Sequence, residues 1–105
     1  MDEFLDALLK ELTAIAKDAA EDIKDALISD GKSFVERTRD DLERWAGLLA
    51  EGKITRDEFE YLVKAKKDLA EMVALKQKGL AQARIDKLRI AVLNAVVDAA
   101  TRTFV

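Results

Sequence analysis

The stretch Glu51-Gly52-Lys53-Ile54-Thr55-Arg56-Asp57-Glu58-Phe59 decides the fold, because one helix ends in it and another begins. Gly52 suits the left-handed conformation that closes a helix. The Thr55 side chain can accept a hydrogen bond from the backbone N–H of Glu58, whose side chain can accept from the N–H of Thr55, which completes a capping box. Ile54 and Phe59 flank this cap as the two apolar groups of a hydrophobic staple. The stretch lies near the middle of 105 residues, so it predicts two helical arms folded back at a hinge near residues 52–55.

The composition predicts an all-α protein. The 105 residues include no Pro and four Gly, and the good helix formers Ala, Leu, Glu, Lys and Arg are abundant. A chain of this length forms one domain, so we expect residues 1–105 to be a single helical domain. The chain has no Cys and no His. That composition rules out disulfides and thiolate chemistry, and it removes the commonest general base and zinc ligand.

Neither a signal peptide nor a membrane span is expected. The chain starts Met1-Asp2-Glu3-Phe4, which is acidic where a signal peptide needs positive charge. The most apolar run, residues 90–97, lies between Arg89 and Asp98 and is far shorter than the roughly 20 residues that cross a bilayer. We therefore expect a cytoplasmic protein.

Apolar residues recur at steps of three and four along both arms, which is the helical signal. Arm one runs over residues 3–51 and arm two over residues 56–104. Folded antiparallel, the arms bring together residues whose numbers add up to about 107, so Phe4 should lie next to Phe104. The predicted architecture is a long antiparallel helical hairpin.

The two halves of the chain carry opposite net charge. Residues 1–54 contain 14 acids and 8 bases, whereas residues 55–105 contain 7 acids and 10 bases. This difference favours pairing of one arm with the other. Each surface ion pair contributes only about 0–1 kcal/mol, so burial must supply most of the energy.

Two glycines mark weak points in the arms and leave a second architecture open. Gly31 lies within Ser29-Asp30-Gly31-Lys32-Ser33, and Gly79 follows Lys78. If the helix continues through Gly31, the glycine costs about 1 kcal/mol. Breaks at both glycines would instead give a monomeric four-helix bundle. Its helices would span roughly residues 3–29, 33–51, 56–78 and 80–104.

The free ends of the arms carry more apolar surface than one helix partner can cover. A helix that is apolar nearly all round is normally buried. We therefore predict that a second copy packs there, so that two hairpins form a four-helix bundle with two-fold symmetry. The predicted contact residues are Leu5, Leu8, Leu9, Leu12, Ile15, Val92, Leu93, Val96 and Val97. Asn94 either sets the register of this contact or faces water.

The central stretch is similar to half of a calcium-binding loop. Gly52, Ile54 and Glu58 resemble the second half of an EF-hand loop. The first and third ligand positions are Gly47 and Leu49, however, and neither side chain can coordinate calcium. No metal site is therefore expected.

The same stretch resembles more closely the short C-terminal oligomerisation domain of many bacterial proteins. In that family a Leu-rich turn is followed by Glu-Gly-x-Ile-Thr, an acidic residue, Glu-Phe and a helix. Residues 48–55 and Glu58-Phe59 match this pattern, over about fifteen residues in the middle of the chain rather than at its end. The resemblance implies helical self-association and names no activity.

These observations predict a non-catalytic structural or adaptor protein that acts by helical self-association, as a homodimer. We predict no catalytic, cofactor-binding or metal-binding residue, since the carboxylates near Glu21 and Asp40 lie on polar helix faces and no His accompanies Ser29 or Ser33. One alternative is a monomeric protein-binding module that docks a partner helix on its apolar end. Another is surface binding to nucleic acid or anionic lipid through the bases of arm two, against which the net charge of −3 argues.

Overall fold

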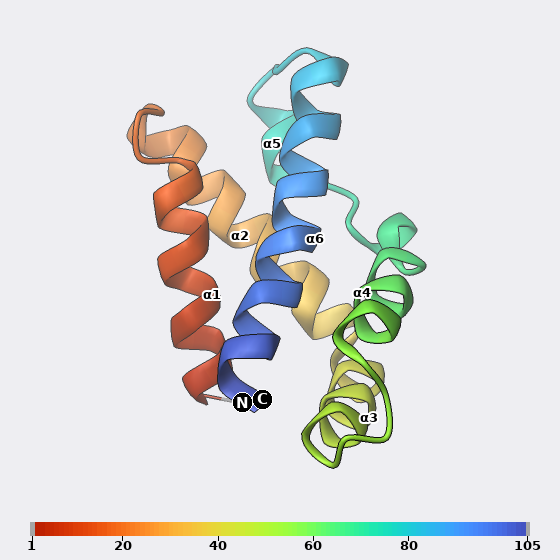
Figure 1. Ribbon diagram of the computed structural model, residues 1–105. Helices are drawn as coiled ribbons and strands as arrows, with labels where there is room; N and C mark the ends of the chain where they lie inside the picture. Colours follow the sequence, from red (N-terminus) through yellow and green to blue (C-terminus); the bar gives the residue numbers. More distant parts are fainter. Residues whose placement is uncertain (1, 105) are drawn as a thin grey trace.

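The computed structural model describes residues 2–104, apart from the side chain of Asp2, and all of its regular structure is helical (Figure 1). This confirms the predicted all-α class. The α-helices are α1 (Asp2–Ile15), α2 (Glu21–Arg37), α3 (Arg39–Ala50), α4 (Arg56–Lys64), α5 (Val73–Gln77) and α6 (Gln82–Phe104). A short 3₁₀ helix, η1 (Lys67–Leu69), precedes α5.

The connection between α3 and α4 has the predicted local geometry. Gly52 has a φ of 73°, which is the left-handed conformation that closes α3. The N–H of Glu58 donates to Oγ1 of Thr55 over 3.1 Å, and the N–H of Thr55 donates to Oε1 of Glu58 over 3.0 Å. The capping box is therefore present, and α4 begins at Arg56 because the box supplies partners for its first free amides.

The structure corrects the prediction of two continuous arms. Arm one leaves the helical conformation at residues 16–20 and again at Thr38, so it forms three helices. Arm two is interrupted over residues 65–72, which include η1, and over residues 78–81. The chain therefore reverses several times and does not form two long rods.

The two weak glycines behave differently from each other. Gly31 is buried inside α2, so the break that the four-helix alternative required at this position is absent. Gly79 has a φ of 74° in the turn that follows α5, so the break that this alternative required there is present. The four-helix alternative, which needed both breaks, does not give the observed helix bounds.

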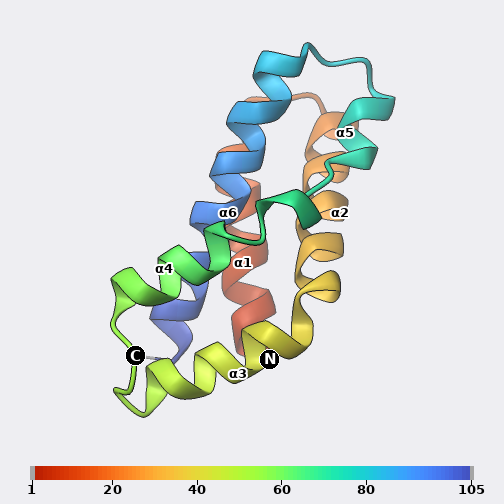
Figure 2. The same cartoon turned by 90° about the vertical axis from the view of Figure 1, so that its right-hand side faces the viewer.

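Helices from opposite halves of the chain nevertheless lie side by side. The first and last helices, α1 and α6, run antiparallel, with the two ends of the chain together at one end of the molecule (Figure 1). The rings of Phe4 and Phe104 stack with their centroids 6.2 Å apart, as predicted. In addition, α2 contacts α5, and α3 contacts α4 (Figure 2). Because α6 also contacts α2, α3 and α4, these three pairs are part of a wider set of helix contacts.

Side chains from all six α-helices meet in one hydrophobic core. The last helix, α6, is central to it and contacts α1, α2, α3 and α4. This position explains why the run from Val92 to Ala100 is apolar on nearly every side, since neighbours within the chain surround it. Among residues 2–104, no helix combines the length and hydrophobicity that crossing a bilayer requires.

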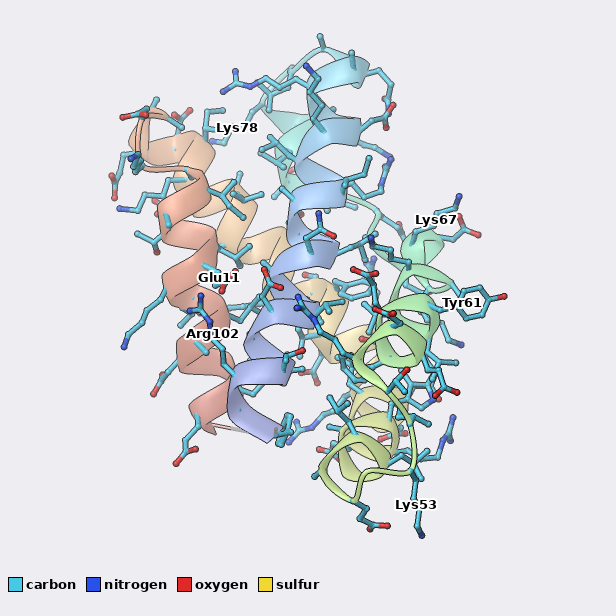
Figure 3. The ribbon with its side chains drawn as sticks, viewed as in Figure 1. Glu11, Lys53, Tyr61, Lys67, Lys78 and Arg102 are labelled. Atoms are coloured by element: carbon cyan, nitrogen blue, oxygen red, sulfur yellow. The ribbon has the colours of Figure 1, made fainter. Side chains whose placement is uncertain are left out.

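Ion pairs between the two halves follow the predicted charge difference. In three of them the base comes from residues 55–105 and the acid from residues 1–54, and one of these, Arg102 with Glu11, is labelled in Figure 3. These pairs are Arg102–Glu11 (3.3 Å), Lys66–Asp41 (3.1 Å) and Lys78–Asp22 (3.8 Å). The pair Arg37–Glu71, at 3.0 Å, has the opposite polarity. Most of these side chains are about 40% exposed or more, although the Glu11 and Asp41 side chains are only 15% and 27% exposed. Partly solvated pairs of this kind help to select the pairing and add little stability.

Candidate docking groove between α1 and α2

The structure separates the nine predicted contact residues into a buried set and a surface set. The buried set is 4% exposed or less and comprises Leu8, Leu12, Val92, Leu93, Val96 and Val97. These side chains already pack against each other and against other helices within one chain, so a second copy could not reach them without unfolding it. Of the nine residues, Leu5, Leu9 and Ile15 remain accessible, and Ile15 is 39% exposed.

Two of the accessible residues, Leu5 and Leu9, line a surface groove of about 630 Å³. The groove runs between the first half of α1 and the last turns of α2. Its apolar floor is formed by Leu5, Leu9 and Val35. Its exposed charged rim is formed by Asp6, Lys32, Glu36 and Arg39. The groove therefore offers a small apolar surface enclosed by charges of both signs.

The shape of the groove follows from how closely α1 and α2 approach at one point. Gly31 faces Leu12 of α1 so closely that a Cβ atom at residue 31 would lie 2.6 Å from Cδ1 of Leu12. From there the two helices diverge toward the start of α3, as Figure 1 shows. The groove opens along this divergence because no other helix fills the space beside Leu5 and Leu9.

Most rim charges have no internal partner. Arg39 pairs with Glu43, with 3.2 Å between Nε and Oε1. Within residues 2–104, Asp6, Lys32 and Glu36 take part in no ion pair. These three charges are therefore free to pair with groups on a docked molecule.

The groove has the character of a protein-docking site more than that of a small-molecule site. Small-molecule sites hold a few polar groups at fixed positions inside an enclosed apolar cavity. Here all four polar side chains are exposed, so no buried polar group would orient a small ligand. Leu5 and Leu9 are one helical turn apart, so the floor matches the spacing of apolar side chains along another helix.

The third accessible residue, Ile15, lines a different cavity, of about 420 Å³, between α1 and α6. Two ion-paired residues, Glu11 and Arg102, also line it, together with Asp98, which pairs with Arg56 at 2.7 Å. Three of its four charged side chains are therefore already paired, and Lys10 is the one lining charge without an ion pair within residues 2–104.

Of the ten basic residues of the second half, six form ion pairs with acids and four, Lys67, Lys76, Arg84 and Lys87, form none within residues 2–104. The six paired residues are Arg56, Lys64, Lys66, Lys78, Arg89 and Arg102. Arg89 also donates from Nε to the carbonyl of Ala70 over 2.8 Å. A polyanion that bound through these six residues would have to displace their acids.

Asp30 is a buried carboxylate outside the groove, and its role was not predicted from the sequence. Asp30 is 6% exposed and accepts hydrogen bonds from the backbone N–H groups of Ala74 and Leu75, each over 2.9 Å. These amides belong to the first turn of α5 and have no partners within that helix. Met72, just before α5, has a left-handed φ of 55°, which is uncommon for a residue with a side chain. Asp30 thus ties α5 to α2 across a strained turn.

A signal for this role was present in the sequence. Asp30 comes three residues after Leu27 and four before Phe34, and both of those residues lie on the buried stripe of α2. A charged residue on a buried stripe needs a hydrogen-bonding partner. The identity of that partner, 44 and 45 residues further along the chain, could not be read from the sequence.

Asp41, in the first turn of α3, has a lowered pKa. The ammonium of Lys66 lies 3.1 Å from Oδ2 of Asp41, and this contact lowers the pKa of the Asp41 carboxyl from its ordinary value of 3.8. Arg44, whose Nη2 lies 2.7 Å from Oδ1, adds to the shift. Both contacts stabilise the ionised carboxylate, so Asp41 links the start of α3 to the end of α4 as an anion.

Among residues 2–104, acidic side chains do not gather into a cluster of three or more that could hold a metal ion. The sequence matches no family model, no curated protein and no solved structure at a significant level. The resemblance of residues 48–59 to a bacterial oligomerisation domain therefore rests on those residues alone. The geometry of the groove is therefore the main indication of what this chain binds.

Proposed function

We propose that this chain is a non-catalytic structural or adaptor module that binds a helix of a protein partner in the groove between α1 and α2. The observation that carries the proposal is the apolar floor of Leu5, Leu9 and Val35 enclosed by an exposed charged rim. Apolar surface that no helix of the chain covers is typical of a protein-docking site.

A helix is the element that best fits this groove. The groove lies between two helices, and a third helix can lay its side-chain ridge along such a space. An apolar face with residues at steps of three and four would place one or two side chains between Leu5, Leu9 and Val35. Polar residues beside that face would meet the rim, where Lys32 and Glu36 are free to pair.

The proposal gives the rest of the fold a supporting role. Leu8 and Leu12 of α1 and Leu27 and Phe34 of α2 are at most 1% exposed, so both helices are held by the core without help from a partner. A docking surface on firmly packed helices needs little rearrangement on binding. The interaction therefore requires no opening of the chain.

Site-directed photo-crosslinking in the native cell tests this proposal. A benzoylphenylalanine is placed at position 9 on the floor, at position 32 on the rim, or at position 61 as a control. Tyr61 is 75% exposed and points outward from α4, away from the groove (Figure 3). We expect discrete adducts from positions 9 and 32, mapped by tandem mass spectrometry to an amphipathic helical segment, and none of these from position 61.

The same experiment is repeated with Leu5→Glu, which puts a charge on the floor. Leu5 is only half-buried, so the variant should fold, and its far-UV circular dichroism checks that it does. We expect the adducts to disappear. Adducts that persist in Leu5→Glu, or that form equally from position 61, would overturn the proposal.

A further inference from the structure

We infer that the partner in the groove is the same face of a second copy of this chain. The α1 and α2 helices of the two copies would then form a four-helix contact around a two-fold axis. This inference rests on the proposed function, since it names the partner of that site. The sequence also predicted self-association, but through residues at the ends of the chain that are mostly buried. Here the contact surface is the groove instead.

The charges of the rim are those that a two-fold contact requires. Such a contact sets one surface against itself, so its charges attract one another across the axis only if that surface carries both signs. The groove has two acids, Asp6 and Glu36, and two bases, Lys32 and Arg39, so its formal charge is balanced. A groove for a strongly acidic or basic partner would carry mostly one sign.

The pairing state of these groups supports the same partner. Asp6, Lys32 and Glu36 make no ion pair within residues 2–104, although ion pairs are common elsewhere on the surface. In a two-fold contact, Lys32 of each copy would meet the acids of the other. Leu5 and Leu9 are half-buried, so each can project into the other copy and also receive its side chains.

The available area sets the strength of the association. The groove lies along the first half of α1, and the whole helix of 14 residues extends over about 21 Å, so this length is an upper limit for the contact. Two helices together are about 20 Å wide, so the face offers on the order of 400 Å². Stable interfaces bury about 800 Å² per partner, so this dimer should be weak and reversible. Its mass must therefore be measured over a range of protein concentration.

The experiment is sedimentation equilibrium of the full chain, with charge-reversal variants of the rim. The unchanged chain should move from 11.7 kDa at low concentration toward twice that mass at high concentration. Lys32→Glu should remain monomeric, and so should the double variant Asp6→Lys with Glu36→Lys, because each rim then repels its own copy. Mixing the two variants should restore the dimer. The control is Lys87→Glu on α6, an exposed residue outside the groove, and it should dimerise like the unchanged chain.

Three results would overturn the inference: a chain that stays monomeric at millimolar concentration, a Lys32→Glu variant that dimerises normally, or variants that do not combine on mixing. All of the altered residues are exposed, and circular dichroism confirms that each variant folds. A monomeric chain whose in-cell adducts contain another polypeptide would overturn this inference and leave the proposed function standing. Absence of groove adducts from the cell would refute the proposed function itself.

Discussion

Replacing Gly31 with Ala tests whether the contact of α2 with Leu12 shapes this fold. Ala is preferred over Gly inside a helix by about 1 kcal/mol, so the change would stabilise α2 if space allowed. The new Cβ would, however, lie 2.6 Å from Cδ1 of Leu12, well inside the 3.5–4.0 Å of a normal carbon contact. Leu12 is fully buried and has little room to move. Overpacking of a core costs about 1–3 kcal/mol, so Gly31→Ala should destabilise the chain by up to about 2 kcal/mol.

A double-mutant cycle separates the two contributions. Leu12→Ala alone should cost about 2–5 kcal/mol, because it leaves a cavity. It also removes the atom that blocks residue 31, so Gly31→Ala in the Leu12→Ala background should stabilise by about 1 kcal/mol. The effect of Gly31→Ala thus changes sign between the two backgrounds, and the coupling energy should be about 1–3 kcal/mol.

Gly47→Ala is the matched control, since Gly47 lies within α3 and nothing lies within 4 Å of its Cβ position. It should stabilise by about 1 kcal/mol in either background. Unfolding in urea is followed by the fluorescence of Trp45, which is 7% exposed, and by circular dichroism, at protein concentrations too low for dimerisation. If Gly31→Ala stabilises as Gly47→Ala does, or if the cycle is additive, the close approach of the two helices is refuted.

Three further substitutions test individual contacts. Asp30→Ala should destabilise by about 2–3 kcal/mol because one buried and one partly buried amide of α5 lose a charged acceptor. Asp30→Asn should cost less. Urea unfolding and loss of hydrogen-exchange protection in α5 measure both variants. Thr55→Ala should lower the free energy of unfolding by about 1 kcal/mol, because the helix cap is lost. Adding Glu58→Ala should lower it little further, since the two side chains of the capping box act as a pair. Equal and additive losses from the two substitutions would contradict this prediction. Lys66→Met should raise the pKa of Asp41 toward 3.8 in a carbon-13 carboxyl titration. In the unchanged chain, folding lowers the pKa of Asp41, so the ionised Asp41 carboxylate stabilises the folded chain above pH 3.8. This stabilisation is lost as the pH falls through the lowered pKa.

The segment between α4 and α5 shows how contacts from other helices hold an irregular stretch. Arg37 of α2 donates from Nη1 to the carbonyl of Leu69 over 3.1 Å, and Arg89 of α6 donates to the carbonyl of Ala70. Leu69 is the last residue of η1 and Ala70 follows it, so both carbonyls lie where no further helical turn supplies donors. The two arginines therefore satisfy backbone groups that the irregular segment leaves free.

The local chemistry of the sequence determined those features that depend on neighbouring residues. The all-helical class follows from helix formers without Pro, and the start of α4 follows from Thr55 and Glu58, which contact each other within one turn. The apolar stripes were also sufficient to predict which ends of the chain meet, because Phe4 and Phe104 occupy matching heights in an antiparallel pair. Of the candidate site, the sequence identified Leu5 and Leu9 as apolar residues on the edge of the α1 stripe.

Tertiary structure decided where the arms bend and which apolar residues stay exposed. Residues 16–20 include three Ala, which favour helix, yet the chain turns there so that α2 can return along α1 and share one core with it. Gly31 has a weak helix propensity but stays helical, because burial against Leu12 outweighs a local cost of about 1 kcal/mol. The rim residues Lys32 and Glu36 join Asp6 only through the packing of α2 beside α1. A contact between residues so far apart depends on how all the helices fill space together, and no local pattern encodes it.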